Sequence, residues 1–171
     1  MGGVLLRPFD EYPGGGRVPL SRPRSGDATC RHGYGLDFQR RTGQTRCAYC
    51  GVSLVDDYHH WLLMALDHVV PAVECGHLGV PSELAGDCIN LGLACSGCNG
   101  FRNRFTISRD MPELVAARAA GWTIESFVAL RDAVFELRSR YVTSRRTSEE
   151  AFYRGRPWVQ RTAAPASTNA Q

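Results

Sequence analysis

The sequence predicts a small α+β protein built around a metal site, and three observations support this prediction. Two C-x2-C motifs, "CAYC" at residues 47–50 and "CSGC" at residues 95–98, have the spacing of paired cysteine ligands. Between and just after them the pattern is strand, long loop, strand and helix. Two further segments are amphipathic and predict a helical C-terminal extension. The 171 residues are enough for one domain with a hydrophobic core.

Charge is distributed unevenly along the chain. All twenty basic residues are arginine, which indicates a GC-rich, bacterial coding sequence. Residues 1–46 and 138–171 carry net charges of +4 and +5, whereas residues 47–137 carry −6. Basic ends around an acidic centre are typical of a protein that binds a polyanion on its outside and a cation inside. Arginine-rich ends that only promote solubility are the alternative.

The N-terminal segment and the apolar runs bear on where the protein resides. The stretch MGGVLLRPFD is interrupted too early, by Arg7 and Pro8, to be a signal peptide. No apolar run reaches the roughly 18 to 20 residues of a membrane span. We therefore expect a cytoplasmic protein without a membrane partner.

The cysteines of the two motifs predict one structural zinc site. A tight turn at each C-x2-C lets two thiolates bind the same tetrahedral ion. In a cytoplasmic chain, two such motifs favour zinc over disulfides. A thioredoxin-like redox pair is the alternative, but it leaves the second motif unexplained. The expected zinc ligands are Cys47, Cys50, Cys95 and Cys98.

Three further cysteines lie outside these motifs. Cys75, His77 and Cys88 share one segment and suggest a second metal site, although buried or surface thiols explain the cysteines more simply. Cys30 has no assigned role. The His59–His60 pair precedes the motif residues and is interpreted as part of the surface or of a hairpin.

The segment between the C-x2-C motifs contains the two predicted strands. Residues 61–70 are apolar and are followed by Pro71, which predicts a strand. Residues 72–88 are rich in glycine, proline and small polar residues and predict a loop, which at this length is usually functional. Residues 89–95, "INLGLAC", predict the second strand, and residues 96–105 predict the first turns of a helix.

The set "CAYCG … LDHVVP … NLGLACSGCNGFRNR" resembles the HNH endonuclease family, in the form whose ββα-metal core is clamped by zinc on four cysteines. The resemblance covers about residues 34–109. A D-H pair alone would be weak evidence, but here it lies between two C-x2-C motifs. The resemblance implies a divalent-metal-dependent endonuclease that hydrolyses DNA and leaves 5′-phosphate and 3′-hydroxyl ends.

The resemblance also implies a role for each motif residue. His68 matches the general base that takes a proton from the attacking water, and Asp67 matches the first ligand of a catalytic Mg²⁺ or Mn²⁺. Asn90 matches the residue that hydrogen-bonds across the loop and orients the histidine. Asn99 matches the second protein ligand; this position is often histidine in the family, so the chain has the D-H/N/N form. Arg102 stands where many members have lysine.

These residue types suit the chemistry independently of the family. A neutral imidazole, with an ordinary pKa of about 6.5, can act as a base near neutral pH. Aspartate and asparagine supply the hard oxygen ligands that Mg²⁺ and Mn²⁺ prefer. Neighbouring side chains in a strand point to opposite faces. We therefore expect Asp67 to face the metal and His68 to face the water.

The parts outside the core complete the prediction. We expect a basic irregular arm over residues 1–33, the nuclease core over 34–109, a helical extension over 110–142 and a basic tail over 143–171 with a disordered end. Within the arm and core, "LDFQRR" predicts a short helix. Arginines near the first motif and after the second are candidate phosphate contacts. They are Arg40, Arg41, Arg46, Arg102 and Arg104.

The helical extension consists of two predicted helices. The first has Asp110 as N-cap and ends at Gly121, and the second begins near Thr123 and Ser126. We expect the pair to pack on the core, with a partner or dimer surface as the alternative. The expected apolar stripe of the second helix is Phe127, Leu130, Val134, Leu137 and Tyr141.

Two other functions stay open at this stage. One is a zinc-containing nucleic-acid-binding module without catalytic activity, and the other is a subunit of a larger defence or mobile-element assembly. The chain has no recognisable helix-turn-helix or other base-reading module. This is consistent with a subunit of an assembly in which a partner supplies specificity. DNA is the expected partner and RNA the alternative. Specificity, nicking against double-strand cleavage, and a monomer against a homodimer are not determined by the sequence.

Overall fold

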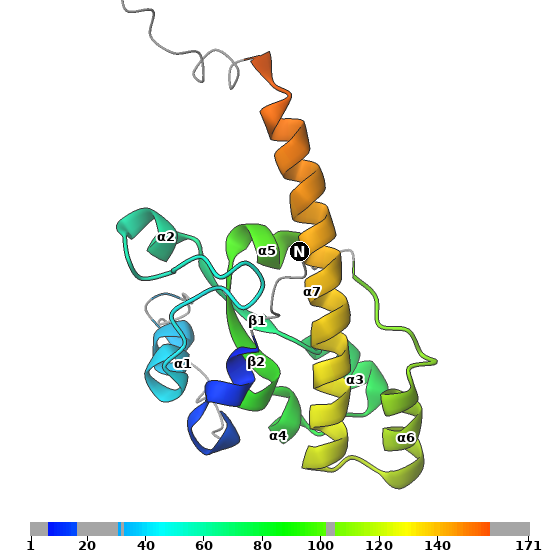
Figure 1. Ribbon diagram of the computed structural model, residues 1–171. Helices are drawn as coiled ribbons and strands as arrows, with labels where there is room; N and C mark the ends of the chain where they lie inside the picture. The colour runs from blue at the N-terminus through cyan, green and yellow to red at the C-terminus, as the bar shows by residue number, and fades with distance from the viewer. Residues whose placement is uncertain (1–6, 17–30, 32, 102–104, 158–171) are drawn as a thin grey trace, which may run out of the picture.

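The computed structural model describes residues 7–16, 31, 33–101 and 105–157. Two antiparallel strands form a small sheet at the centre, and helices surround it (Figure 1). The protein is therefore α+β, as the sequence predicts. Among the described helices, none is both long and apolar enough to cross a membrane. Cys30, Arg102 and Arg104 lie outside the described residues.

The sheet consists of β1 (Met64–His68) and β2 (Leu91–Cys95). Their register places Asp67 opposite Gly92. β2 is buried along most of its length, which agrees with the apolar strand predicted for residues 89–95.

β1 is shorter than the strand predicted over residues 61–70. The first part of that segment belongs to α2 (Tyr58–Leu62). The helix begins there because the Asp57 side chain accepts a hydrogen bond from the His60 N–H at 2.9 Å, which satisfies one of the free amides of the first turn.

The loop predicted over residues 72–88 is wrong, because most of this segment is helical. α3 (Ala72–Leu78) and α4 (Ser82–Ala85) each begin directly after a proline, and the short 3-10 helix η3 (Cys88–Asn90) leads into β2. Gly79 follows α3 with a φ of 71°, a left-handed conformation that favours glycine. Most of the glycines and prolines that suggested a loop are therefore helix boundaries, whereas Gly76 lies inside α3.

Two helices flank the C-x2-C motifs. α1 (Tyr34–Thr42) confirms the helix predicted at "LDFQRR", and it ends at Gly43, whose φ is 74°. α5 (Ser96–Phe101) follows β2 without a break and contacts both strands and the long C-terminal helix. The order strand, connection, strand, helix is thus present, although the connection is helical.

Part of the segment predicted to be an irregular arm packs into the core. η1 (Pro8–Glu11) and η2 (Pro13–Gly16) are two 3-10 helices. The Phe9 ring packs edge-on against Phe135 with 5.1 Å between ring centroids. The buried Tyr12 hydroxyl donates to Gln44 Oε1 at 2.7 Å. The local composition of this segment predicted an irregular arm. Composition does not show that the side chains of Phe9 and Tyr12 pack against residues far along the chain.

The C-terminal part forms α6 (Pro112–Ala120) and α7 (Ile124–Arg154). The N-cap position of α6 is Met111 rather than Asp110, whereas the predicted start of α7 is confirmed by a capping box between Thr123 and Ser126. α7 does not end by residue 142, and its C-terminal end extends beyond the rest of the described chain (Figure 1).

α7 packs on the core, but through a face that differs from the predicted stripe. Leu137 is 38% exposed, whereas two arginines lie on the buried side. The predicted stripe contained only apolar residues, and the actual one also contains polar residues with partners in the core. The buried residues of α7 are Phe127, Leu130, Arg131, Val134, Phe135, Arg138, Ser139 and Val142.

Candidate metal and catalytic site

The four motif cysteines lie together. Their Sγ atoms are all within 4.8 Å of one another, and no other group of His, Cys, Asp and Glu that could hold a metal occurs among the described residues. A tetrahedral thiolate site is typical of structural zinc. The cluster could therefore hold a metal such as zinc, as the spacing predicts.

Local backbone geometry forms both halves of the cluster. After Cys47 the chain turns so that the Gly51 N–H donates to the Cys47 carbonyl at 2.9 Å, with a φ of 72° at Gly51. At the other half, the Cys98 N–H donates to Cys95 Sγ at 3.4 Å because Cys95 ends β2 directly before α5. Each C-x2-C thus directs two thiols toward the same point.

Hydrogen bonds between the thiols shift their pKa values in opposite directions. Hydrogen bonding to Cys47 lowers the pKa of Cys50 to about 6 and also lowers the pKa of Cys95. Hydrogen bonds within the cluster raise the pKa of Cys47, with Cys50 as the main cause. They also raise the pKa of Cys98, with Cys47 as the main cause. Deprotonated thiols are the form in which cysteine binds a divalent cation.

Cys75 and Cys88 are buried thiols. Burial is the main reason that the pKa of each is raised to about 11, so both stay protonated at neutral pH. The Cys75 thiol donates to the Val70 carbonyl at 3.6 Å, and His77 is exposed. This agrees with the simpler of the two alternatives for these cysteines.

Asp67 is buried at the end of β1 and bound by two donors. Its Oδ2 atom accepts hydrogen bonds from the Tyr49 hydroxyl at 2.5 Å and from Arg138 Nη2 at 2.7 Å. Burial, and then the negative charge of Asp67, raise the pKa of Tyr49 well above its usual value, so the hydroxyl is protonated and donates. Asp67 therefore faces the first cysteine motif and α7.

Arg138 also binds the backbone next to Asp67. Its Nη1 atom donates to the His68 carbonyl at 2.7 Å and to the Val69 carbonyl. The Asp67 and Arg138 side chains are each 1% exposed, so removal of one would leave the other charge buried and cost about 3–5 kcal/mol. His68 itself is half-buried.

Sequence reasoning did not identify Tyr49 or Arg138. A signal for Arg138 exists, since Arg131 and Arg138 lie two helical turns apart on the face that also carries Phe127 and Val134. For Tyr49, the signal in the sequence is its position within the first C-x2-C motif, between Cys47 and Cys50.

Asn90 joins the two ends of the connection between the strands. It is fully buried, and its Oδ1 atom accepts from the Val70 N–H at 2.9 Å. Its Nδ2 group donates to the carbonyls of Val70, at 3.0 Å, and of Ala85, at 2.9 Å. The backbone two residues after His68 is thereby fixed to the connection.

Within the part of the chain that the structure describes, Asn99 presents an oxygen without a hydrogen-bond donor. Its Oδ1 atom is buried and has no hydrogen-bond partner among the described residues. Buried polar atoms are nearly always paired, by protein, water or an ion. An oxygen ligand to a cation fits this environment, and Asn99 directly follows the zinc-ligand candidate Cys98.

The three described arginines among the candidate phosphate contacts differ in their environment. Arg40 on α1 is exposed, whereas Arg41 forms an ion pair with Asp37 at 2.9 Å. Arg46 is exposed, and its guanidinium donates to the Gly51 carbonyl at 3.0 Å. Arg40 therefore has the guanidinium that is easiest to reach from outside.

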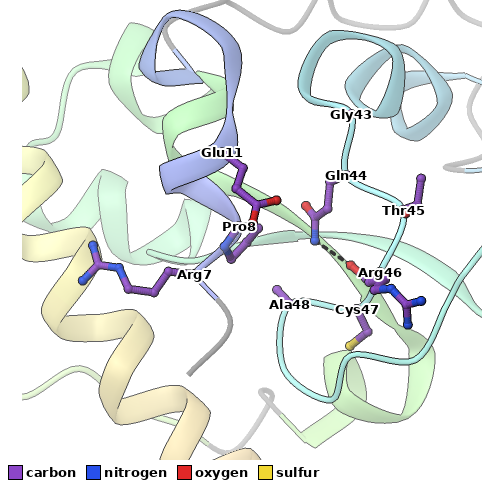
Figure 2. Close-up of a pocket in the computed structure, with 9 residues that line it drawn as sticks. All are labelled: Arg7, Pro8, Glu11, Gly43, Gln44, Thr45, Arg46, Cys47 and Ala48. Carbon is purple, nitrogen blue, oxygen red and sulfur yellow. Dashed lines mark hydrogen bonds between the residues drawn. The ribbon is translucent and has the colours of Figure 1, made fainter. Parts of the chain in front are cut away.

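A cleft of about 290 Å³ lies beside the first cysteine motif. Arg7 and Glu11 line it from the N-terminal turn, and Gln44, Arg46 and Cys47 line it from the segment after α1 (Figure 2). Asp67, His68, Asn90 and Asn99 are not among the described residues that line it. The cleft is therefore separate from the candidate catalytic residues.

Comparison with protein families, with curated proteins and with solved structures gave no match for this chain.

Proposed function

We propose that the protein is an HNH endonuclease that hydrolyses DNA phosphodiester bonds with a divalent metal. The observation that carries the proposal is the order of its parts. A strand ends in Asp67 and His68, an antiparallel strand returns, and the helix after it carries Asn99. The four-cysteine cluster lies at the other end of the sheet, where β2 meets α5.

His68 acts as the general base in the proposed mechanism and takes a proton from the attacking water at an imidazole nitrogen. Asp67 and Asn99 would hold Mg²⁺ or Mn²⁺ through their side-chain oxygens, and the Asn99 Oδ1 atom is buried without a hydrogen-bond partner among the described residues. When bound, the cation stabilises negative charge on the phosphate and on the leaving 3′ oxygen. Asn90 acts through the backbone after His68 and keeps the histidine oriented.

The metal ligands can be tested by titration of plasmid cleavage. Replacement of Asn99 by alanine is expected to raise the Mg²⁺ or Mn²⁺ concentration for half-maximal cleavage about 10-fold or more, because one oxygen ligand is lost. Zinc content and melting temperature are expected to stay unchanged. Asn99→Asp keeps an oxygen ligand and serves as the conservative control. An Asn99→Ala protein with the native metal titration would remove this residue from the ligand set.

Contact between α1 and the DNA backbone predicts a change in salt dependence. Arg40→Gln is expected to reduce the slope of log K against log salt by about one unit, since one phosphate contact is lost. Arg41→Gln should have a smaller effect because its guanidinium is paired with Asp37. The measurement is fluorescence anisotropy of a labelled duplex at several salt concentrations.

The control for this measurement is Arg118→Gln. Arg118 is exposed on α6, which lies on the opposite side of the molecule from α1 (Figure 1). An Arg40→Gln protein with the native slope would place α1 away from the backbone of the DNA.

One observation favours a second candidate, a nucleic-acid-binding zinc module without catalytic activity or a subunit that needs a partner. Asp67 is buried in an ion pair with Arg138, an arrangement that also suits a purely structural aspartate. Binding without cleavage of supercoiled, linear or single-stranded DNA, or of RNA, with either metal, would select this alternative.

A further inference from the structure

We infer that Tyr49 and Arg138 are positioning residues that fix the Asp67 carboxylate for binding of the divalent cation. The inference rests on the proposed function through the assignment of Asp67 as a metal ligand. It makes the first cysteine motif and the C-terminal helix parts of the same site.

The carboxylate is bound from two directions. The Tyr49 hydroxyl and Arg138 Nη2 both donate to Asp67 Oδ2, at 2.5 and 2.7 Å. A carboxylate with one oxygen bound in this way cannot rotate freely about its terminal torsion. The carboxylate therefore keeps one orientation, which lowers the entropy lost when it binds a cation.

Tyr49 transmits the geometry of the cysteine cluster to this carboxylate. It lies between Cys47 and Cys50, so a metal on these two thiols also fixes the tyrosine backbone. Its side chain is held in place by neighbours as well, because its ring lies 5.5 Å from Phe135 and the Arg138 guanidinium lies 5.5 Å from the ring centre. Occupancy of the four-cysteine site should therefore strengthen cation binding at Asp67.

Arg138 fixes both the carboxylate and the backbone that carries it. Nη2 binds Asp67 while Nη1 binds the His68 and Val69 carbonyls, so one planar group joins the side chain to the end of β1. A lysine at this position is a single point donor and cannot maintain both sets of contacts. The direction of the carboxylate relative to His68 thus depends on the guanidinium.

The chain contains a matched control for each residue. Arg131 is also buried on α7, but it binds the Ile89 carbonyl at 2.8 Å and pairs with Asp132. Tyr12 is a buried tyrosine whose hydroxyl donates to Gln44 and to the Leu91 carbonyl. The hydrogen bonds of both controls are with other groups, so each is expected to reproduce the stability loss without the proposed effect.

The test measures Mn²⁺ binding to zinc-loaded protein, without DNA, by electron paramagnetic resonance of the free ion. We expect Tyr49→Phe and Arg138→Lys each to weaken Mn²⁺ binding about 10-fold or more, as is typical when a partner of a metal ligand is removed. We expect Tyr12→Phe and Arg131→Lys to stay within about twofold of the native protein. Tyr49→Phe removes only a hydroxyl, so it remains informative if the arginine variant does not fold.

The outcomes separate this inference from the proposed function. Native affinity for Mn²⁺ in folded Tyr49→Phe would overturn the inference. A native protein that binds Mn²⁺ in the expected way but cleaves no nucleic acid would refute the nuclease function and leave the positioning roles standing.

Discussion

Replacement of Cys95 by serine is expected to remove the bound zinc and to unfold the centre of the protein. Cys95 ends β2, lies 3.8 Å from Cys50 between Sγ atoms and accepts the Cys98 N–H, so it belongs to the sheet and to the cluster. Structural zinc contributes about 10–16 kcal/mol of apparent binding free energy in small zinc sites. This is comparable to the whole free energy of unfolding of a typical domain, about 5–15 kcal/mol.

Zinc content by atomic absorption and thermal unfolding by circular dichroism measure both parts of this expectation. Cys75→Ser is the control, because Cys75 is a buried cysteine that lies outside the cluster, whereas Cys95 is half-buried within it. We expect the control to keep one zinc per chain and to melt as a cooperative unit at a somewhat lower temperature. A Cys95→Ser protein that keeps its zinc and melts like the native one would refute the four-cysteine assignment.

Replacement of His68 by alanine should abolish cleavage without loss of the fold. Removal of a general base typically lowers a rate about 10²- to 10⁴-fold. The backbone at this position stays fixed because His68 pairs with Leu91 in the sheet and its carbonyl accepts from Arg138. The defect should therefore appear in the rate at saturating metal, with zinc content and melting unchanged.

The measurement is cleavage of supercoiled plasmid with Mg²⁺ or Mn²⁺, with and without EDTA. His77→Ala is the control, since its imidazole is 62% exposed on α3. Equal rates for His68→Ala and native protein would exclude His68 as the base. No metal-dependent cleavage by the native protein would count against the nuclease function as a whole.

The features that could be predicted from the sequence depend on short-range spacing. Two residues between cysteines are enough to predict the four-cysteine cluster, and the capping residues Thr123 and Ser126 are enough to predict the start of α7. The glycines and prolines between the strands predicted a loop, but Pro71, Gly79, Pro81 and Gly86 each begin or end a short helix. Composition does not distinguish a loop from several helices with such boundaries.

The features that could not be predicted depend on partners far apart in the chain. Nothing local to Phe9 indicates that its ring packs on Phe135, and nothing local to Arg138 indicates a carboxylate on β1. Helical periodicity places Arg138 on the inner face of α7 once Phe127 and Val134 are known to be buried. It does not identify which acid compensates the charge, and only the tertiary structure does so.

The buried pair of Asp67 and Arg138 has a consequence for synthesis on the ribosome. The arginine emerges 71 residues after the aspartate. At about 5–20 residues per second, roughly 4 to 14 s separate them. During that interval a nascent chain carries the D-H motif without the counter-ion that holds it in place. In the proposed function, the site around Asp67 is therefore complete only after Arg138 has left the ribosome.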